Sequence, residues 1–407
     1  MLYAGIDWSD QALDFELLGT DGTVLVEGCV SPDVSGMTDL FMQLEQHGQP
    51  SQIGIAIEAV RGPWVEALLA RGYIVYAINP KTADYFRRAQ SAAGDKSDSI
   101  DRHVLAMFLM GQHRRLHPLK PVDPDLAALR IACEDRLRLV EERTAKLNEL
   151  KAALKTYYPA ALGLFGDLDS RISLTFLMEF PTQREMQSLA PKSFRNWLRR
   201  NKYNRNDRLE AMMAQLVAPV LEVANHLQDA KAGHIAYLAK SVRDLNDAVR
   251  QVDAAITRRF QAMPESGWVS SLPGAGPTIA PSLLVCVGRD PQRFACTRQA
   301  QALMGTAPVT KASGRVRTVH MRQACWKFAR RTLQCFADHS REKCAWAASV
   351  YEQKRQSGYG HHGALRVVAN KWLKIILAMQ RAGRRYEEHR FTHSRERFLL
   401  NAAGSVA

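Results

Sequence analysis

Four acidic residues in the first quarter of the chain are spaced so that their carboxylates could act together. Asp7 and Glu58 each follow a short apolar run typical of a buried strand, and Asp98 and Asp101 lie three residues apart on one face of a predicted helix. Carboxylates brought so close repel one another unless divalent cations neutralise them, and their hard oxygens favour Mg²⁺ or Mn²⁺. The spacing predicts two ions roughly 3.5–4 Å apart, which would stabilise the entering and leaving oxygens of a phosphoryl transfer.

Each acid also has a purely structural interpretation. Asp7 could be a turn residue, Glu58 a solvated strand end, and the later pair an acidic helix cap stabilised by the helix dipole. Asp95 competes for a ligand role, and Asp10 does so more weakly. Two acids at strand ends together with a pair opening a helix favour the metal site over four independent structural roles.

A serine in the last third of the chain is the second candidate for chemistry. Ser313 precedes Gly314 in a basic segment, and the surrounding cations are Lys311, Arg315, Arg317 and Arg322. A hydroxyl in such surroundings could attack a phosphodiester while the cations stabilise the transition state. It could equally do no more than donate a hydrogen bond to a phosphate.

A glycine-rich turn lies upstream of this serine, in Ser271-Leu-Pro-Gly-Ala-Gly-Pro277. The turn resembles that of a helix-hairpin-helix motif. There, Gly274 and Gly276 would let the backbone approach a phosphate, and the next helix would offer its N-terminal amides to the anion. The alternative is a tight turn that only joins two helices.

The elements that must position the acids predict an α/β domain over residues 1–118. We expect strands at 2–6, 14–19, 23–27, 53–57 and 73–78, with a helix at 64–71. Three hairpin-like strands followed by alternating helices and strands describe an RNase H-like sheet. In that sheet the first strand is central, so Glu58 and the helix carrying Asp98 and Asp101 should converge on Asp7.

The rest of the chain is predicted to be mostly helical. A proline-bounded linker precedes residues 122–260, where apolar residues recur at threes and fours along two long segments. These segments could pair as an antiparallel coiled coil or belong to an ordinary helical bundle. Residues 261–407 are expected to form a mostly α-helical C-terminal domain.

Charge is distributed very unevenly along the chain. The net charge is +14 over 407 residues, yet residues 1–110 have 7 Lys and Arg against 15 Asp and Glu. The remainder therefore carries a large positive charge. This distribution is typical of a protein whose basic part binds phosphate groups and whose acidic part carries a cluster of carboxylates. With no signal peptide, no 18-residue apolar run and no cysteine pattern for zinc or disulfides, we expect a cytoplasmic protein without a membrane partner.

Taken in order, these motifs resemble the DEDD transposases of bacterial insertion sequences, relatives of the Piv-type DNA invertases with a RuvC-like N-terminal domain. The resemblance rests on these segments: Gly5-Ile-Asp7, Ile57-Glu-Ala59, Ile78-Asn-Pro80 with Phe86, Lys96-Ser-Asp-Ser-Ile-Asp101, Leu272-Pro-Gly-Ala-Gly276, Phe294, Gly305-Thr-Ala-Pro308, Ser313-Gly314 and Leu365-Arg-Val-Val-Ala-Asn-Lys371. It implies that Asp7, Glu58, Asp98 and Asp101 bind the metal ions. It also implies that Ser313 forms a transient phosphoserine bond to DNA.

The resemblance further implies partners. It predicts donor and target DNA, a structured guide RNA from the element's own non-coding end, and a homo-oligomer, a dimer or a tetramer, assembled through the coiled-coil region. The sequence departs from the family pattern at Arg102, where a small residue is usual, in a glycine-poor segment after Gly314, and in a longer helical middle.

Two other functions stay open at this point. One is a structure-specific nuclease in which the acids activate water and Ser313 only contacts phosphate. The other is a nucleic-acid-binding protein without catalysis, whose acids serve as helix caps.

Overall fold

The computed structural model describes residues 1–90, 98–121, 123–219, 223–314 and 316–389. The chain divides into two compact units, residues 1–123 and residues 124–407. Each unit is built around its own buried apolar side chains, so each can be described by itself.

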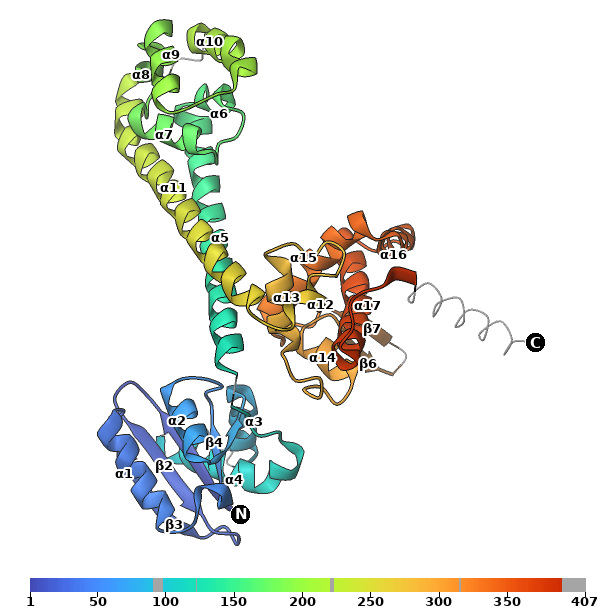
Figure 1. The fold of residues 1–407 in the computed structure, drawn as a ribbon. Coiled ribbons are helices and arrows are strands. Elements are labelled where there is room, and N and C mark those ends of the chain that lie inside the picture. The colour runs from blue at the N-terminus through green and yellow to red at the C-terminus, as the bar shows by residue number, and fades with distance from the viewer. Residues whose placement is uncertain (91–97, 122, 220–222, 315, 390–407) are drawn as a thin grey trace, which may run out of the picture. The chain divides into compact units, whose positions relative to one another are not determined.

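The N-terminal unit is a five-stranded mixed sheet with helices on its faces (Figure 1). The strands are β1 (Leu2–Trp8), β2 (Leu13–Leu18), β3 (Val24–Val30), β4 (Ile53–Ile57) and β5 (Ile74–Ala77). Their order is β3-β2-β1-β4-β5, with the first three antiparallel and β4 and β5 parallel to β1. This is the strand order of an RNase H-like sheet, and it confirms the predicted α/β domain with β1 at the centre.

Alternating side chains give the sheet two different faces. One face packs Ile6, Phe15 and Ile55 into a core with helices α1 (Val34–Glu45) and α2 (Pro63–Arg71). The other face packs against α3 (Pro80–Gln90) and α4 (Asp98–Gln112). Two short 3-10 helices, η1 (Pro50–Gln52) and η2 (His113–Arg115), complete the helical elements described in this unit. Because the side-chain period of a strand is two, residues two apart along β1 or β4 share a face.

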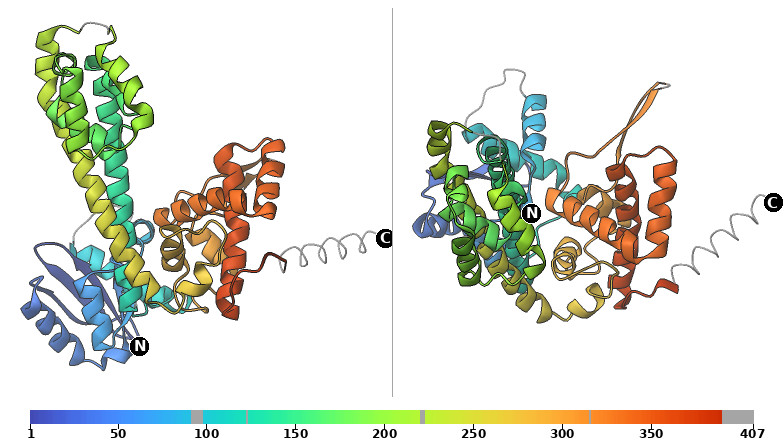
Figure 2. Two further views of the ribbon diagram at one scale, coloured as in Figure 1. Left: turned by 45° about the horizontal axis from the view of Figure 1, so that its top comes forward. Right: turned by 90° about the horizontal axis from the view of Figure 1, so that it is seen from above.

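Two long helices, α5 (Pro124–Tyr157) and α11 (Asn225–Gln261), pack against each other in the C-terminal unit. The first turns of α5 and the last turns of α11 contribute to one core, and their opposite ends contribute to another. The helices therefore run antiparallel, an arrangement compatible with either of the two alternatives that the apolar repeats left open (Figure 2, left). Among the described residues, no helix has the length and apolar character needed to cross a bilayer.

A small helical lobe joins these two helices at one end. Its elements are α6 (Ala161–Leu164), α7 (Arg171–Glu179), α8 (Gln183–Gln187), α9 (Pro191–Arg200), η3 (Asn206–Arg208) and α10 (Leu209–Val217). The lobe has an aromatic centre in which Phe165, Phe176, Phe194 and Trp197 contact one another. We refer to residues 161–217 as the helical lobe.

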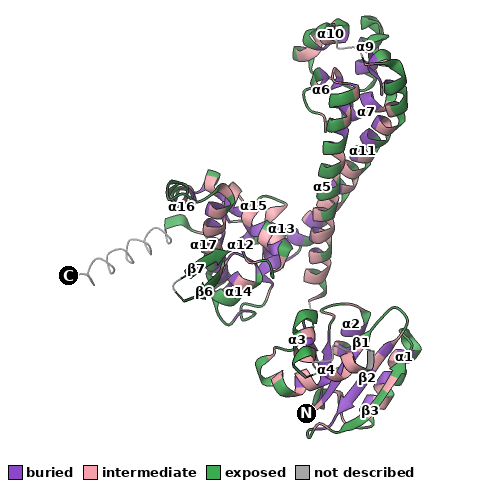
Figure 3. Ribbon diagram, turned by 180° about the vertical axis from the view of Figure 1, so that it is seen from behind, coloured by how far each residue is buried: buried purple, intermediate pink, exposed green. Residues whose placement is uncertain are grey.

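The C-terminal core is mostly helical, as predicted. Its elements are α12 (Ser266–Val269), α13 (Ile279–Val287), α14 (Thr297–Leu303), α15 (Lys327–Lys343), α16 (Ala345–Gln356), α17 (His361–Ala382) and a two-stranded hairpin of β6 (Val309–Ser313) and β7 (Val316–His320). The sequence predicted only a basic loop here, because the hairpin has no buried face to produce an apolar alternation. Both strands are exposed along almost their whole length (Figure 3).

Candidate active site

The parallel register of β1 and β4 brings the first two predicted carboxylates to one edge of the sheet. Ile6 is paired with Ile57; Asp7 is the next residue on β1, and Glu58 is the first residue after β4. Neighbouring strands are separated by about 4.8 Å. Asp7 lies two residues after Gly5, so its side chain belongs to the face that α4 covers. Glu58 comes directly after β4, two residues beyond Ala56, which belongs to the core that α4 covers.

Helix α4 runs antiparallel to β1, and its N-terminus is therefore at this same edge. A Cβ atom at Gly5 would lie 2.0 Å from the carbonyl oxygen of Arg102, whereas Tyr3, two residues earlier, contacts His113 just beyond the other end of α4. Because glycine has no side chain, the backbone of α4 can approach the backbone of β1 closely at Gly5. The first turn of α4, with Asp98 and Asp101, consequently lies toward the ends of β1 and β4.

The carboxylate of Asp101 is held by a cation from α3. Arg87 Nη1 donates a hydrogen bond of 2.7 Å to Asp101 Oδ1, and a second nitrogen of Arg87 contacts Asp84. This hydrogen bond, which the carboxylate of Asp101 accepts, raises the pKa of the Arg87 guanidinium. The side chain of Asp98 lies outside what the structure describes, as does the competing residue Asp95.

The donor chemistry at this edge suits a divalent cation, because carboxylate oxygens are the ligands that Mg²⁺ and Mn²⁺ prefer. Asp7 and Glu58 are placed by backbone register, and the start of α4 approaches them. Within the described ranges, however, no three acidic, histidine or cysteine side chains are gathered closely enough to hold an ion. The structure thus brings the backbone at Asp7 and Glu58 close to the first turn of α4. The side chain of Asp101 in that turn is bound to Arg87.

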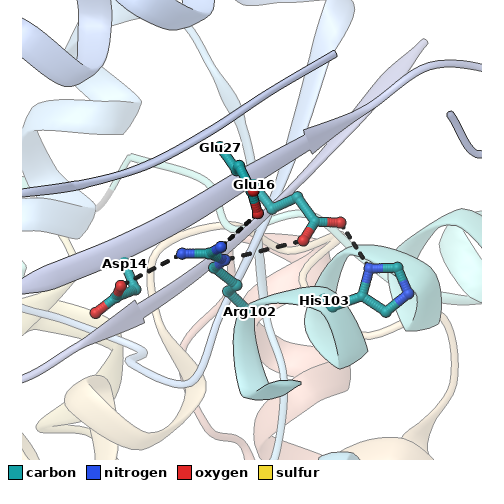
Figure 4. A network of polar contacts seen from close by, with 5 residues as sticks. All are labelled: Asp14, Glu16, Glu27, Arg102 and His103. Atoms are coloured by element: carbon teal, nitrogen blue, oxygen red, sulfur yellow. Dashed lines mark hydrogen bonds and ion pairs between the residues drawn. The ribbon is translucent and has the colours of Figure 1, made fainter. Parts of the chain in front are cut away.

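A polar network that the sequence did not reveal includes Asp14, the residue paired with Asp7 across β1 and β2. Figure 4 shows its five side chains. Arg102 Nη1 lies 3.4 Å from Asp14 Oδ1, and its Nη2 contacts Glu27. Its buried Nε lies 3.9 Å from Glu16 Oε2, close enough for an ion pair but too far for a hydrogen bond. On the other side, His103 Nδ1 is 2.6 Å from Glu16 Oε1.

This network gives a structural role to Arg102, which stands where the DEDD transposase pattern usually has a small residue. In the register of β1 and β2, Asp14 lies opposite Asp7 and Glu16 lies opposite Gly5, so both acids share the face covered by α4. Glu16 is only 3% exposed, and a buried carboxylate needs a cationic partner. The pattern Asp14-Phe-Glu16 could have predicted two acids on one strand face. It could not have shown which cation would neutralise them.

Ser313 lies at the tip of the β6–β7 hairpin. It is paired with Val316 across a two-residue turn, and Gly314 has a φ of +54°, the conformation that such hairpin turns require. The side chain of Ser313 is exposed. The hairpin extends away from the helices of the C-terminal core (Figure 2, right). An exposed hydroxyl at the tip of a projecting arm can reach a macromolecular substrate.

The cations predicted around Ser313 fall into two groups. Lys311 and Arg317 are exposed on β6 and β7. Arg322 is half-buried, and its Nε donates a hydrogen bond of 3.4 Å to the carbonyl oxygen of Ala307, beside the start of the hairpin. Arg315 lies outside the described residues. Arg322 therefore helps to fix the base of the arm, whereas the other two cations are available to a ligand.

Two segments that carried the family resemblance meet at the base of this arm. Thr306 Oγ1 donates a hydrogen bond of 3.0 Å to Asn370 Oδ1 on α17, and Gln301 Nε2 lies 3.4 Å from the carbonyl oxygen of Asn370. Both Thr306 and Gln301 are buried. The contacts attach the segment before β6 to the longest helix of the C-terminal core.

The two glycines of the predicted helix-hairpin-helix turn have different surroundings. Gly274 has a φ of +83°, and a Cβ there would lie 2.9 Å from the backbone of His339 and Ser340 on α15. Gly276 has no heavy atom within 4 Å of its Cβ position, and it lines an open hollow of about 570 Å³ with Ser271 and others. Gly274 thus serves packing, and only Gly276 faces open space.

The order of the sheet and the acids at the ends of β1 and β4 are compatible with a DEDD domain of the RNase H-like class. Comparison with known proteins gives the family. A transposase family, the IS110-type DEDD transposases, matches residues 4–159, and the transposase family of IS116, IS110 and IS902 matches residues 267–352. The chain belongs to the IS110 family of DEDD transposases and is a DNA transposase of an insertion sequence.

Individual relatives agree over most of the chain. A mini-circle protein of Streptomyces coelicolor, named as a candidate transposase for IS117, is 28% identical over 96% of both chains. The 42 kDa protein of insertion element IS900 from Mycobacterium paratuberculosis is 25% identical over 93% of this chain and 96% of its own. The 44.8 kDa protein of IS116 from Streptomyces clavuligerus is 25% identical over 77% of this chain and 78% of its own.

Proposed function

We propose that this transposase cuts and rejoins DNA with the carboxylates of Asp7, Glu58, Asp98 and Asp101 and the hydroxyl of Ser313. The observation that carries the proposal is the convergence of Asp7, Glu58 and the first turn of α4 on one edge of the sheet. Divalent cations bound there would supply positive charge to the oxygens of the reacting phosphodiester.

The serine would act as the nucleophile. Its oxygen would attack phosphorus, a bond from phosphorus to a deoxyribose oxygen would break, and that oxygen would leave as a hydroxyl after taking up a proton. The resulting phosphoserine ester would be resolved by attack of a second DNA hydroxyl, which restores the phosphodiester and frees the serine. Support comes from the exposure of Ser313 on a projecting arm with Lys311 and Arg317 nearby.

An element-encoded structured RNA is the proposed guide, and a dimer or tetramer is the proposed assembly. The strongly positive charge after residue 110 supports contact with more than one polynucleotide, and the two exposed long helices α5 and α11 offer a surface for a second copy. Deleting the non-coding segment next to the gene should abolish transposition in cells if the RNA is required. Light scattering would give the mass of the assembly.

Three variants test the chemistry on labelled DNA carrying the element ends. Asp7→Asn should abolish cleavage while leaving DNA binding intact. Ser313→Ala should abolish the covalent protein–DNA adduct and strand exchange. Thr310→Ala, on the opposite face of the same hairpin, is the matched control and should keep both.

The outcomes separate the three functions that the sequence left open. If Ser313→Ala keeps metal-dependent cleavage at the wild-type rate, the protein is a nuclease that uses water. If Asp7→Asn changes nothing, the carboxylates are not catalytic and the proposal fails.

A further inference from the structure

The outer face of helix α9 in the helical lobe is strongly basic. Residues 188–206 contain six Lys and Arg and no Asp or Glu. One of the six, Arg205, is paired with Asp207. The other five are all exposed: Lys192, Arg195, Arg199, Arg200 and Lys202. We call these five residues the basic face. The segment lies between the two stretches that match the family, so the resemblance assigns it no role.

The fold gives this helix two opposite sides. Phe194, Trp197 and Leu198 are at most 3% exposed and pack into the core of the lobe. Lys192, Arg195 and Arg199 are separated by three and four residues, which places them in one row on the other side. The cations are therefore held in a fixed array by a buried anchor.

No counter-charge neutralises this array. Within the described part of the chain, none of the five residues of the basic face has an ion pair, whereas nearby Arg184 and Arg205 pair with Asp229 and Asp207. Like charges at this spacing on a helix repel one another. A bound polyanion would remove that repulsion.

A small hollow continues the basic face at the end of α9. It has a volume of about 350 Å³, and its lining includes Ser170, Arg171, Asn201, Lys202 and Tyr203. Arg171 is exposed at the start of α7 and adds a sixth cation to the same region. Arg171 and Lys202 supply the hollow with cationic donors of the kind that phosphate oxygens accept hydrogen bonds from.

Two other kinds of partner fit poorly. A membrane surface needs an apolar helix face to insert, and that face of α9 is already buried. Single-stranded nucleic acid is usually bound by stacking bases on exposed aromatic rings. The aromatic side chains of α9, Phe194 and Trp197, are buried in the lobe core.

We propose that the basic face binds the phosphate backbone of duplex DNA without reading its sequence. From Lys192 to Arg200 the helix rises about 12 Å, a length over which duplex DNA carries about seven phosphate charges. The lobe would thus hold DNA with residues other than the carboxylates of the N-terminal unit and Ser313. The proposal rests on charge and burial, and it does not depend on the proposed chemistry.

The test is the salt dependence of binding to a random-sequence duplex of about 30 base pairs, measured in EDTA with the full-length chain. The variant is Lys192→Gln/Arg195→Gln/Arg199→Gln. The matched control is Arg138→Gln/Lys240→Gln/Arg250→Gln, which removes three exposed cations from α5 and α11 that are already ion-paired. Thermal melting should show both variants folded like the wild type, because all six side chains are exposed.

Loss of three phosphate contacts should reduce the slope of log Kd against log salt by about 2.7. Between 50 and 200 mM salt the wild type should therefore lose about 40-fold more affinity than the variant, whereas the control should follow the wild type. Equal slopes for the variant and the control would overturn the proposal. The proposal would also be overturned if the variant had the wild-type slope on duplex DNA but a reduced slope on a structured RNA. RNA would then be the ligand of the basic face.

Because the assay measures binding without cleavage, its result stands whatever Asp7→Asn and Ser313→Ala do to activity.

Discussion

Substituting Gly5 by alanine should uncouple the carboxylates without removing any of them. The new Cβ would lie 2.0 Å from the carbonyl oxygen of Arg102 and 2.7 Å from the amide nitrogen of Ala106. An ordinary contact is 3.4 Å or more, so α4 must move away from β1 by about 1.4 Å. The N-terminal turn that carries Asp98 and Asp101 would move with it.

Two quantities follow from this displacement. Overpacking of this kind typically destabilises a fold by about 1–3 kcal/mol, so the protein should still fold. A shift of about 1 Å in catalytic groups can reduce activity about 100-fold. We therefore expect Gly5→Ala to melt a few degrees below the wild type and to cleave DNA about 100-fold more slowly.

Gly111→Ala is the matched control on the same helix. No heavy atom lies within 4 Å of its Cβ position, and alanine is favoured over glycine in a helix by about 0.5–1 kcal/mol. Cleavage rates of labelled DNA and melting curves of both variants provide the comparison. If Gly5→Ala cleaves at the rate of Gly111→Ala, the close packing of α4 on β1 does not position the catalytic groups.

Two further predictions concern the polar network and the glycine turn. Arg102→Met should destabilise the N-terminal unit by about 3 kcal/mol in urea unfolding, because the buried Glu16 would keep only His103 as a partner and Asp14 would lose its cation. Adding Glu16→Gln should recover part of that loss, and no recovery would mean that Arg102 acts by packing alone. Gly274→Ala should destabilise the C-terminal unit by about 1–3 kcal/mol, because its Cβ would meet the backbone of α15. Gly276→Ala should change its melting temperature little, and equal losses at both positions would contradict the different surroundings of the two glycines.

The sequence by itself determined the framework of the N-terminal unit. The apolar runs before Asp7 and Glu58 predicted β1 and β4, and turn residues between the early strands predicted the hairpin of β2 and β3. These features are local, because alternation and turn chemistry are encoded within a few residues. The same is true of the long apolar repeats that predicted α5 and α11.

Only the tertiary structure decided which charged groups meet. Arg102 neutralises Asp14, Glu16 and Glu27 on neighbouring strands, and Arg87 faces Asp101 from another helix. These pairs are separated by 14 to 88 residues in the chain, and their contacts depend on the packing of α4 against the sheet and α3. No local pattern encodes such a distance.

The hairpin bearing Ser313 and the basic face of α9 illustrate the same division. The sequence identified Ser313 and its cations, but an exposed hairpin lacks the buried alternation that predicts strands. The charges of residues 188–206 are visible in the sequence, yet the availability of the basic face follows from the burial of Phe194 and Trp197 and from the absence of ion pairs to its five cations among the described residues. The types and charges of neighbouring residues can be read from the sequence, whereas burial and charge pairing depend on contacts between segments that are distant in the chain.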